Sequence, residues 1–402
     1  MQVTFSDIQA AASRLASVID TTPLDRSQTY SQLSHNHIYL KLENMQRTGS
    51  FKIRGAYNKI SALAPDERSR GVIAASAGNH AQGVAYAARL LNIPCTIVMP
   101  KMASLSKVEA TRRYGAEIVL HGQSYDDAYA KAKELQEETG YTFIHAFDDP
   151  DVIAGQGTIG LELLEQNQHL DAIVAPIGGG GLISGIAIAA KAIKPDIKIY
   201  GVEASGAACF RRSLDAGDIT TLDTVSTIAD GIAVKRPGNL TYDTVKNLVD
   251  DVFVVEDEAI ARTMVMLMER SKVVSEGASA SALAAILTNH LPFENKHVAV
   301  VISGGNVDMM LLSRIIEHGL VAAGRHARFV TTLPDRPGSL ANLVAAVADV
   351  GANIVSIEHH RLGQSLILGH VEVDMAVETR NEEHIEELRQ RFLTLGYSFQ
   401  MK

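Results

Sequence analysis

Short apolar runs alternate with longer amphipathic segments between about residues 70 and 205. The apolar runs are residues 71–76, 93–100, 116–120, 141–146, 172–177 and 197–204, and helical patterns between them cover 81–91, 124–138 and 182–193. Alternation of this kind predicts parallel strands joined by helical crossovers. Because the runs are almost continuously apolar, we expect strands that are buried on both faces. The pattern therefore predicts open, twisted, parallel sheets of the α/β class.

The pattern changes after a further apolar run at 297–302. Residues 303–320 predict a helix that ends at Gly319, and residues 321–326 predict a linker. The remaining chain predicts strands at 327–334, 353–361, 364–377 and 397–401, with helices at 335–351 and 382–396. The order β-α-β-β-α-β is typical of a ferredoxin-like sandwich. We therefore predict a first unit at 1–320 and a second domain at 327–402.

Composition and charge exclude several classes of protein. The 402 residues carry 37 Lys and Arg against 46 Asp and Glu, a net charge of −9, so no basic face for nucleic acid is expected. Cys95 and Cys209 offer neither a disulfide framework nor a zinc cluster, which favours the cytoplasm, and no secretory signal is evident. Residues 173–190 are uncharged but contain a proline and four glycines, so we expect strand, turn and helix rather than a membrane span.

Three loops follow predicted strands and precede predicted helices, where ligands bind on open α/β sheets. One loop contains four consecutive glycines before Leu182: Gly178, Gly179, Gly180 and Gly181. Backbone N–H groups at such a helix start suit a phosphate, although a flexible turn is the alternative. No Gly-Lys-Ser/Thr follows the glycines, and Ile183 stands where a dinucleotide fingerprint requires its third glycine.

The other two loops and one lysine complete the set of candidate residues. Ser76, Ala77, Gly78, Asn79 and His80 could direct backbone donors at a carboxylate, or Asn79 could simply cap a helix. Ser303 offers a hydroxyl beside two glycines, or caps a helix.

Lys52 follows the turn formed by Gly49 and Ser50 and opens a predicted helix. Burial there would lower the pKa of its amine, as imine formation or proton transfer requires, although an exposed helical lysine is the alternative.

Taken together, these residues carry a family resemblance. The segments SFKIRGA (50–56), SAGNHAQG (76–83), PIGGGGLISG (176–185) and SGGNVD (303–308) resemble the pyridoxal-phosphate-dependent threonine/serine dehydratase family of the tryptophan-synthase-β-like fold, also called fold type II. The C-terminal segment DRPGSLANL (335–343) resembles an ACT domain, a regulatory module that binds small molecules. The resemblance implies a two-lobed catalytic unit whose small lobe occupies about 45–150.

The resemblance also implies a role for each candidate residue. Lys52 would bind pyridoxal 5′-phosphate covalently, Phe51 would pack on its ring and Asn79 would bond the ring hydroxyl. The glycine loop with Leu182 would hold the phosphate, Ser303 would face the pyridine nitrogen, and loop 76–80 would hold the substrate carboxylate. The implied reaction is β-elimination from L-threonine, with Lys52 as base, which yields 2-oxobutanoate and ammonia; L-serine would give pyruvate.

Several questions stay open at this point. Ala77 stands where related racemases carry serine, which favours a dehydratase, but a serine dehydratase or racemase and a non-catalytic sensor of a phosphorylated ligand are the alternatives. Glu203 and Ala207 match two ligands of a family cation site, whereas Cys209 replaces the expected acidic ligand, which leaves a monovalent cation as the alternative to a divalent one. An amino-acid effector is expected at Asp335, Pro337, Gly338 and Ser339, and a homodimer or homotetramer is expected.

Overall fold

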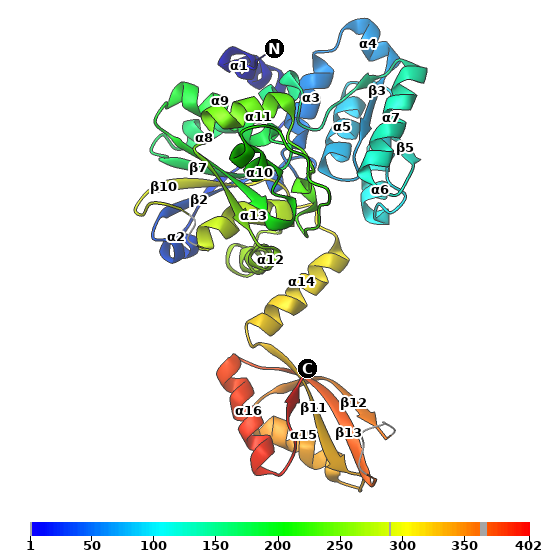
Figure 1. Ribbon diagram of the computed structural model, residues 1–402, viewed down its shortest axis with the longest axis vertical. Helices are drawn as coiled ribbons and strands as arrows, with labels where there is room; N and C mark the ends of the chain where they lie inside the picture. The colour runs from blue at the N-terminus through cyan, green and yellow to red at the C-terminus, as the bar shows by residue number, and fades with distance from the viewer. Residues whose placement is uncertain (1, 289–290, 362–367) are drawn as a thin grey trace. The chain divides into compact units, whose positions relative to one another are not determined.

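The chain folds as two compact units, Met1–Asp308 and Met309–Lys402 (Figure 1). The computed structural model describes residues 2–288, 291–361 and 368–402. Its first unit is an α/β structure with parallel-rich sheets and its second contains an antiparallel sheet, which confirms the predicted fold class. Within the described ranges, no helix is long and apolar enough to cross a membrane.

The large lobe of the first unit is built on a six-stranded sheet in the order β1-β2-β10-β7-β8-β9. Its strands are β1 (Leu24–Ser27), β2 (His37–Leu42), β7 (Ala172–Pro176), β8 (Lys198–Ala204), β9 (Asp251–Val255) and β10 (His297–Ile302). All neighbours pair in parallel except β1, which pairs antiparallel with β2. The sheet is therefore parallel except at this edge. The connection through the seven-residue helix α2 (Gln28–Ser34) is shorter than the dozen residues that a parallel crossover needs.

The small lobe holds a second sheet, which is parallel throughout, in the order β5-β4-β3-β6. Its strands are β3 (Val72–Ala75), β4 (Cys95–Met99), β5 (Glu117–Leu120) and β6 (Thr142–Phe143).

Helices cover the sheets of both lobes (Figure 1). Besides α2, the first unit contains α1 (Phe5–Leu15), α3 (Lys52–Ser61), α4 (Pro65–Arg70), α5 (Asn79–Leu90), α6 (Leu105–Arg112), α7 (Tyr125–Thr139), α8 (Pro150–Gln166), α9 (Gly181–Ile193), α10 (Cys209–Ala216), α11 (Asn239–Leu248), α12 (Asp257–Met266) and α13 (Gly277–Leu287).

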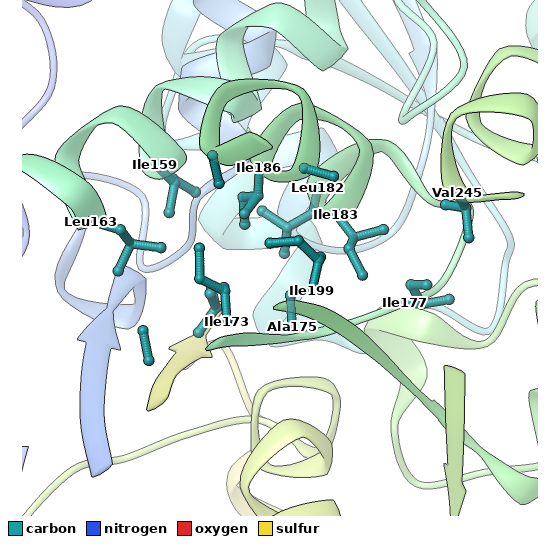
Figure 2. Close-up of a cluster of buried hydrophobic side chains, with 14 of the residues drawn as sticks. Ile159, Leu163, Ile173, Ala175, Ile177, Leu182, Ile183, Ile186, Ile199 and Val245 are labelled. Carbon is teal, nitrogen blue, oxygen red and sulfur yellow. The ribbon is translucent and has the colours of Figure 1, made fainter. Parts of the chain in front are cut away.

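The main core of the large lobe lies between helices α8 and α9 and the strands β7 and β8. Figure 2 shows side chains of both helices, including Ile159 and Ile186, directed toward Ile173 and Ile199 of the strands. Each is fully buried, and burying one isoleucine stabilises the fold by about 1.5–3 kcal/mol. Because β7 and α9 are both packed in this core, the glycine turn between them is held in place at both ends.

The second unit begins with α14 (Met309–Ala322) and continues as the predicted βαββαβ domain. Its sheet has the order β12-β13-β11-β14, with β11 (His326–Pro334), β12 (Asn353–His360), β13 (His370–Glu378) and β14 (Gln400–Met401), and its other helices are α15 (Ser339–Val350) and α16 (Glu382–Thr394). The predicted strand at 364–377 extends over residues 364–367, which lie outside the described residues. Of the predicted linker 321–326, Val321 and Ala322 are helical and His326 opens β11.

The helix predicted from residue 303 begins only at Met309. Residues 303–306 instead form a loop that bonds to distant main chain. Phe51 N–H donates to the Ser303 carbonyl at 3.0 Å, and Glu276 N–H donates to the Gly304 carbonyl at 3.1 Å. These bonds hold the loop out of helical geometry.

Candidate active site

A cavity of about 760 Å³ brings the predicted residues of the first unit together. Its walls include Phe51, Lys52, Ser76, Ala77, Gly78, Asn79, His80, Gly178, Gly179, Gly180, Gly181, Leu182 and Ser303. The loops lie at the carboxyl ends of β3, β7 and β10, where the sheet rule predicts a ligand. One cavity thus contains the amine, the glycine turn, the small-residue loop and the hydroxyl.

Lys52 is the first residue of α3, and its amine points into the cavity wall. Its Nζ donates to the carbonyl oxygen of Ala146 at 2.8 Å and lies 5.2 Å from the centre of the Phe51 ring. Burial lowers the pKa of the Lys52 amine to about 8, and the nearby carboxylate of Glu276 opposes this shift. A lysine with this pKa has a substantial neutral fraction near pH 8, as a nucleophile or base requires.

Helix α3 is held to the large lobe by a buried group of charges. Arg54, two residues after Lys52, binds Glu43 and Glu162, and Lys41 binds Glu162 at 2.6 Å. Arg54, Glu43 and Lys41 are fully buried. The backbones of α3 and α5 also approach each other closely at Gly83 of α5. A Cβ added to Gly83 would lie 3.1 Å from the main-chain carbonyl carbon of Lys52. These contacts fix the start of α3, and with it the amine.

The glycine turn meets the structural requirements of a phosphate site. No backbone N–H between residues 178 and 182 donates to an acceptor within the described part of the chain. These N–H groups lie at the N-terminus of α9, where the helix dipole favours an anion. Gly180 has φ +92°, which favours glycine, and a Cβ on Gly179 would lie 2.2 Å from the Phe147 ring. The turn therefore fits a phosphate dianion, and Phe147 explains why position 179 is glycine.

The small-residue loop offers main-chain donors. The N–H groups of Ala77, Asn79 and His80 find no acceptor among the residues that the structure describes, as expected if they serve a carboxylate. The His80 side chain does not share this role, because its Nε2 donates to the Ile144 carbonyl at 2.9 Å. Burial lowers the pKa of His80 to about 3, so the ring is neutral.

Ser303 presents a neutral hydroxyl to the cavity. Its Oγ lies 3.0 Å from Ser279 Oγ, and the Ser279 hydroxyl donates to the Gly304 carbonyl at 2.5 Å. Because the single proton of Ser279 is used there, Ser303 is the donor in the contact between the two hydroxyls. The Ser303 hydroxyl is neutral and can rotate to form a hydrogen bond with a ring nitrogen in the cavity.

Sequence reasoning missed several residues of the cavity wall, above all Glu276. Its carboxylate accepts a bond of 2.7 Å from Asn79 Nδ2, and burial raises its pKa to about 7. Asn306 and Phe147 were also missed. The signal for Glu276 was present, because an acidic residue directly precedes the helix GASASALAAIL, which is buried on all sides.

The predicted cation residues lie outside this cavity wall. Glu203, at the end of β8, accepts N–H bonds of 2.8 Å from Phe210 and from Arg211 at the start of α10. Burial raises the pKa of Glu203 to about 7. Ala207 and Cys209 are buried nearby, and in the described ranges no group of three His, Cys, Asp or Glu side chains could hold a metal ion. The Glu203 carboxylate thus caps a helix.

The predicted effector residues lie in the second unit. Asp335, Pro337 and Gly338 are exposed before α15, which Ser339 opens. Gly338 has φ +90° and open space where a side chain would stand.

Comparison with known proteins identifies the family. The model of the family described as "Pyridoxal-phosphate dependent enzyme" matches residues 15–304. The chain belongs to this family. Pyridoxal phosphate is therefore its cofactor, and the amine, glycine turn and Ser303 of the cavity fit that group. Residues 327–396 match the ACT domain model.

Individual relatives of this pyridoxal-phosphate-dependent enzyme include three threonine enzymes and a serine racemase. The chain is 47% identical to the L-threonine ammonia-lyase of Thermotoga maritima over 98% of each protein, and 49% identical to the catabolic L-threonine dehydratase of Escherichia coli over 78% of this chain and 96% of that protein. Among solved structures, the processed threonine deaminase isoform 2 of Solanum lycopersicum has a TM-score of 0.75 at 39% identity, covering 78% of this chain and 91% of that one. Maize serine racemase has a TM-score of 0.76 at 41% identity, covering 80% and 99%.

Proposed function

We propose that this enzyme is a threonine ammonia-lyase, which converts L-threonine to 2-oxobutanoate and ammonia and also accepts L-serine. The observation that carries the proposal is the 47% identity to an L-threonine ammonia-lyase over 98% of both chains, which includes the ACT domain. A non-catalytic sensor does not agree with membership of an enzyme family.

The residues of the cavity support a one-base elimination. Pyridoxal phosphate, when bound, supplies an electron sink for the negative charge that develops at Cα. The N–H groups of 178–182 would hold its phosphate, and the Ser303 hydroxyl would face its ring nitrogen. The free N–H groups of loop 76–80 would bind the substrate carboxylate and orient Cα toward Lys52.

Lys52 would act as the general base. Its lowered pKa gives a substantial fraction of neutral amine near pH 8, and Lys52 lines the cavity, where its Nζ donates to the Ala146 carbonyl. Ala77, which also lines the cavity, has no group that exchanges a proton. We infer that the Cα proton is removed from one face and is not returned from the other, so elimination is favoured over racemisation.

A coupled assay tests this function. The holoenzyme is supplied with L-threonine, L-serine, D-threonine and D-serine, and the released 2-oxo acid and ammonia are measured together with D-amino acid. We expect 2-oxobutanoate and ammonia in equal amounts from L-threonine, and pyruvate from L-serine. Formation of D-serine without 2-oxo acid would favour the racemase that the 41% identity to maize serine racemase keeps as the second candidate.

We also propose that the ACT domain binds a small amino-acid effector near Asp335, Pro337, Gly338 and Ser339, in a homodimer or homotetramer. The exposed backbone at Gly338 supports this location. The test adds isoleucine, valine or an adenine nucleotide to the assay and compares the parent with Gly338→Val. An effector that acts equally on both proteins would contradict the location.

A further inference from the structure

Three polar side chains of the cavity wall form a continuous row of hydrogen bonds that starts at a main-chain carbonyl. Asn306 Nδ2 donates to the carbonyl oxygen of Thr48 and to Asn79 Oδ1, both at 2.8 Å. Asn79 Nδ2 then donates to Glu276 Oε1 at 2.7 Å. The row joins residues that lie about 200 or more positions apart in the sequence.

The donor-to-acceptor direction of these hydrogen bonds is determined at one end of the row only. The Thr48 carbonyl can only accept, so Asn306 must present its Nδ2 there, and the second proton of Nδ2 meets Asn79 Oδ1. The other end does not impose a direction: burial raises the pKa of Glu276 to about 7, and a protonated Glu276 could donate to an amide oxygen. Asn306 therefore decides which end of the Asn79 amide faces Glu276.

This direction determines what Asn79 offers to a ligand. An amide nitrogen carries two protons, and Asn79 uses one of them toward Glu276. The second proton has no acceptor in the described part of the chain and lies on a residue of the cavity wall. With the amide reversed, Asn79 would present an acceptor instead.

We propose that Asn306 is a positioning residue that holds the Asn79 amide in the orientation that directs an N–H group, rather than a carbonyl, at the oxygen substituent of the cofactor ring. The inference rests on the proposed function, because it concerns the same cofactor site. Asn306 acts through Asn79. A hydrogen bond donated to this oxygen stabilises its anionic form and so adjusts the electronic state of the ring.

Main-chain contacts hold Asn306 in place. Gly305 N–H donates to the Gly49 carbonyl at 2.9 Å, and Ser50 and Gly304 form an antiparallel bridge. Gly49 has φ +70°, and a Cβ there would lie 2.5 Å from Asn306 Oδ1. The absence of a side chain at Gly49 therefore makes space for the Asn306 amide. The turn before Lys52 and the loop after Ser303 are thus joined where Asn306 sits.

The decisive variant is Asn306→Asp, which keeps the shape of the side chain but removes both donated protons. A carboxylate there would attract the Asn79 Nδ2 protons and reverse its amide. Asn306→Ala removes the donor without supplying an acceptor, so it should affect Asn79 less. Asn247→Asp is the matched control. Asn247 is exposed on α11, so this substitution adds the same negative charge away from the cavity.

The readouts are the visible absorption spectrum of the holoenzyme between pH 6 and 10, and kcat and KM for L-threonine. We expect Asn306→Asp to shift the absorption band or its pH midpoint and to lower kcat by about tenfold or more, the effect of losing one bond to a charged group, with a smaller change in KM. Asn306→Ala should lie between this variant and the parent, and Asn247→Asp should match the parent.

A double-variant comparison separates positioning from simple bracing of the two loops. In an Asn79→Ala background there is no amide to orient, so adding Asn306→Asp should cause no further spectral shift. An unchanged spectrum in Asn306→Asp, or an equal further shift in the Asn79→Ala background, would overturn the inference. A cofactor band that forms without release of 2-oxo acid would contradict the proposed function instead, and the spectral comparison would still decide the role of Asn306.

Discussion

The guanidinium of Arg54 makes two hydrogen bonds of 2.8 Å with the carboxylate of Glu43, and both side chains are fully buried. Glu162 binds the other side of the same guanidinium at 2.6 Å. The neighbouring carboxylates hold the pKa of Arg54 above its usual value in spite of burial. The helix that carries Lys52 is thereby attached to the large lobe through charges that water does not screen.

Replacing Arg54 by methionine should destabilise the protein strongly. The change leaves Glu43 and Glu162 without this partner in the interior, and breaking a buried ion pair in this way costs about 3–5 kcal/mol. Urea unfolding followed by circular dichroism measures the loss. Arg389→Met, which breaks the exposed pair with Glu386, is the control and should cost far less, because water screens that pair. Equal losses in the two variants would contradict this account of α3.

Replacing Lys52 by methionine should stabilise the cofactor-free protein at neutral pH. The pKa of Lys52 is about 8 in the fold against 10.5 for an unperturbed lysine, so between these values the unfolded chain binds more protons. The charged amine therefore destabilises the fold fully below pH 8, and this penalty disappears as pH rises toward 10.5. Unfolding midpoints in urea at pH 7 and pH 10 should show a benefit of Lys52→Met that shrinks at the higher pH. The same variant should lack both the visible cofactor band and lyase activity.

Glu276→Gln should change stability with the opposite pH dependence. The pKa of the buried Glu276 carboxyl is raised to about 7 from 4.5, so the folded protein binds the extra proton between these values. Stability is therefore lost as pH rises from 4.5 through 7, and glutamine avoids that loss. We expect Glu276→Gln to gain on the order of 1–3 kcal/mol over the parent at pH 8 and little at pH 4.5, as measured by chemical unfolding. An equal gain in stability at both pH values would contradict the raised pKa of Glu276.

Gly179→Ala should impair cofactor binding because its methyl group overlaps the Phe147 ring. A Cβ there would lie 2.2 Å from that ring, closer than side chains approach. Equilibrium dialysis with pyridoxal phosphate should show weaker binding by Gly179→Ala, and the added change Phe147→Ala should recover part of it. If the double variant binds no better than Gly179→Ala alone, the methyl group obstructs the phosphate directly rather than through Phe147.

Ala77→Ser should add weak racemase activity. A hydroxyl at this position lies on the wall of the cavity and can exchange a proton, which a methyl group cannot. A chiral assay with L-serine should detect D-serine from the variant and not from the parent. Absence of D-serine from an otherwise active variant would count against the role assigned to Ala77.

The sequence predicted those features that arise within short segments. Strands such as β7 and β10 were recognisable because they are apolar at nearly every position, and the glycine turn and Lys52 were recognisable from their immediate neighbours. Other features depend on contacts between distant segments. The sequence wrongly predicted a helix from residue 303. The hydrogen bonds that hold residues 303–306 in a loop go to residues 48–51 and 276, more than twenty positions away, and such bonds leave no pattern in the local sequence. The acidic residue before a buried helix was a local signal for Glu276, but its role depends on Asn79, which lies 197 positions away.

The contact between Gly83 and the main chain of Lys52 sets a distance that side chains cannot adjust. The loop that we propose to bind the substrate carboxylate leads into helix α5, and α3 begins with Lys52, the proposed base, so the two backbones meet about one turn from both groups. On this proposal, the spacing between the carboxylate site and the base depends on two main chains in close contact. One methyl group at position 83 would therefore push the two helices apart and alter that spacing.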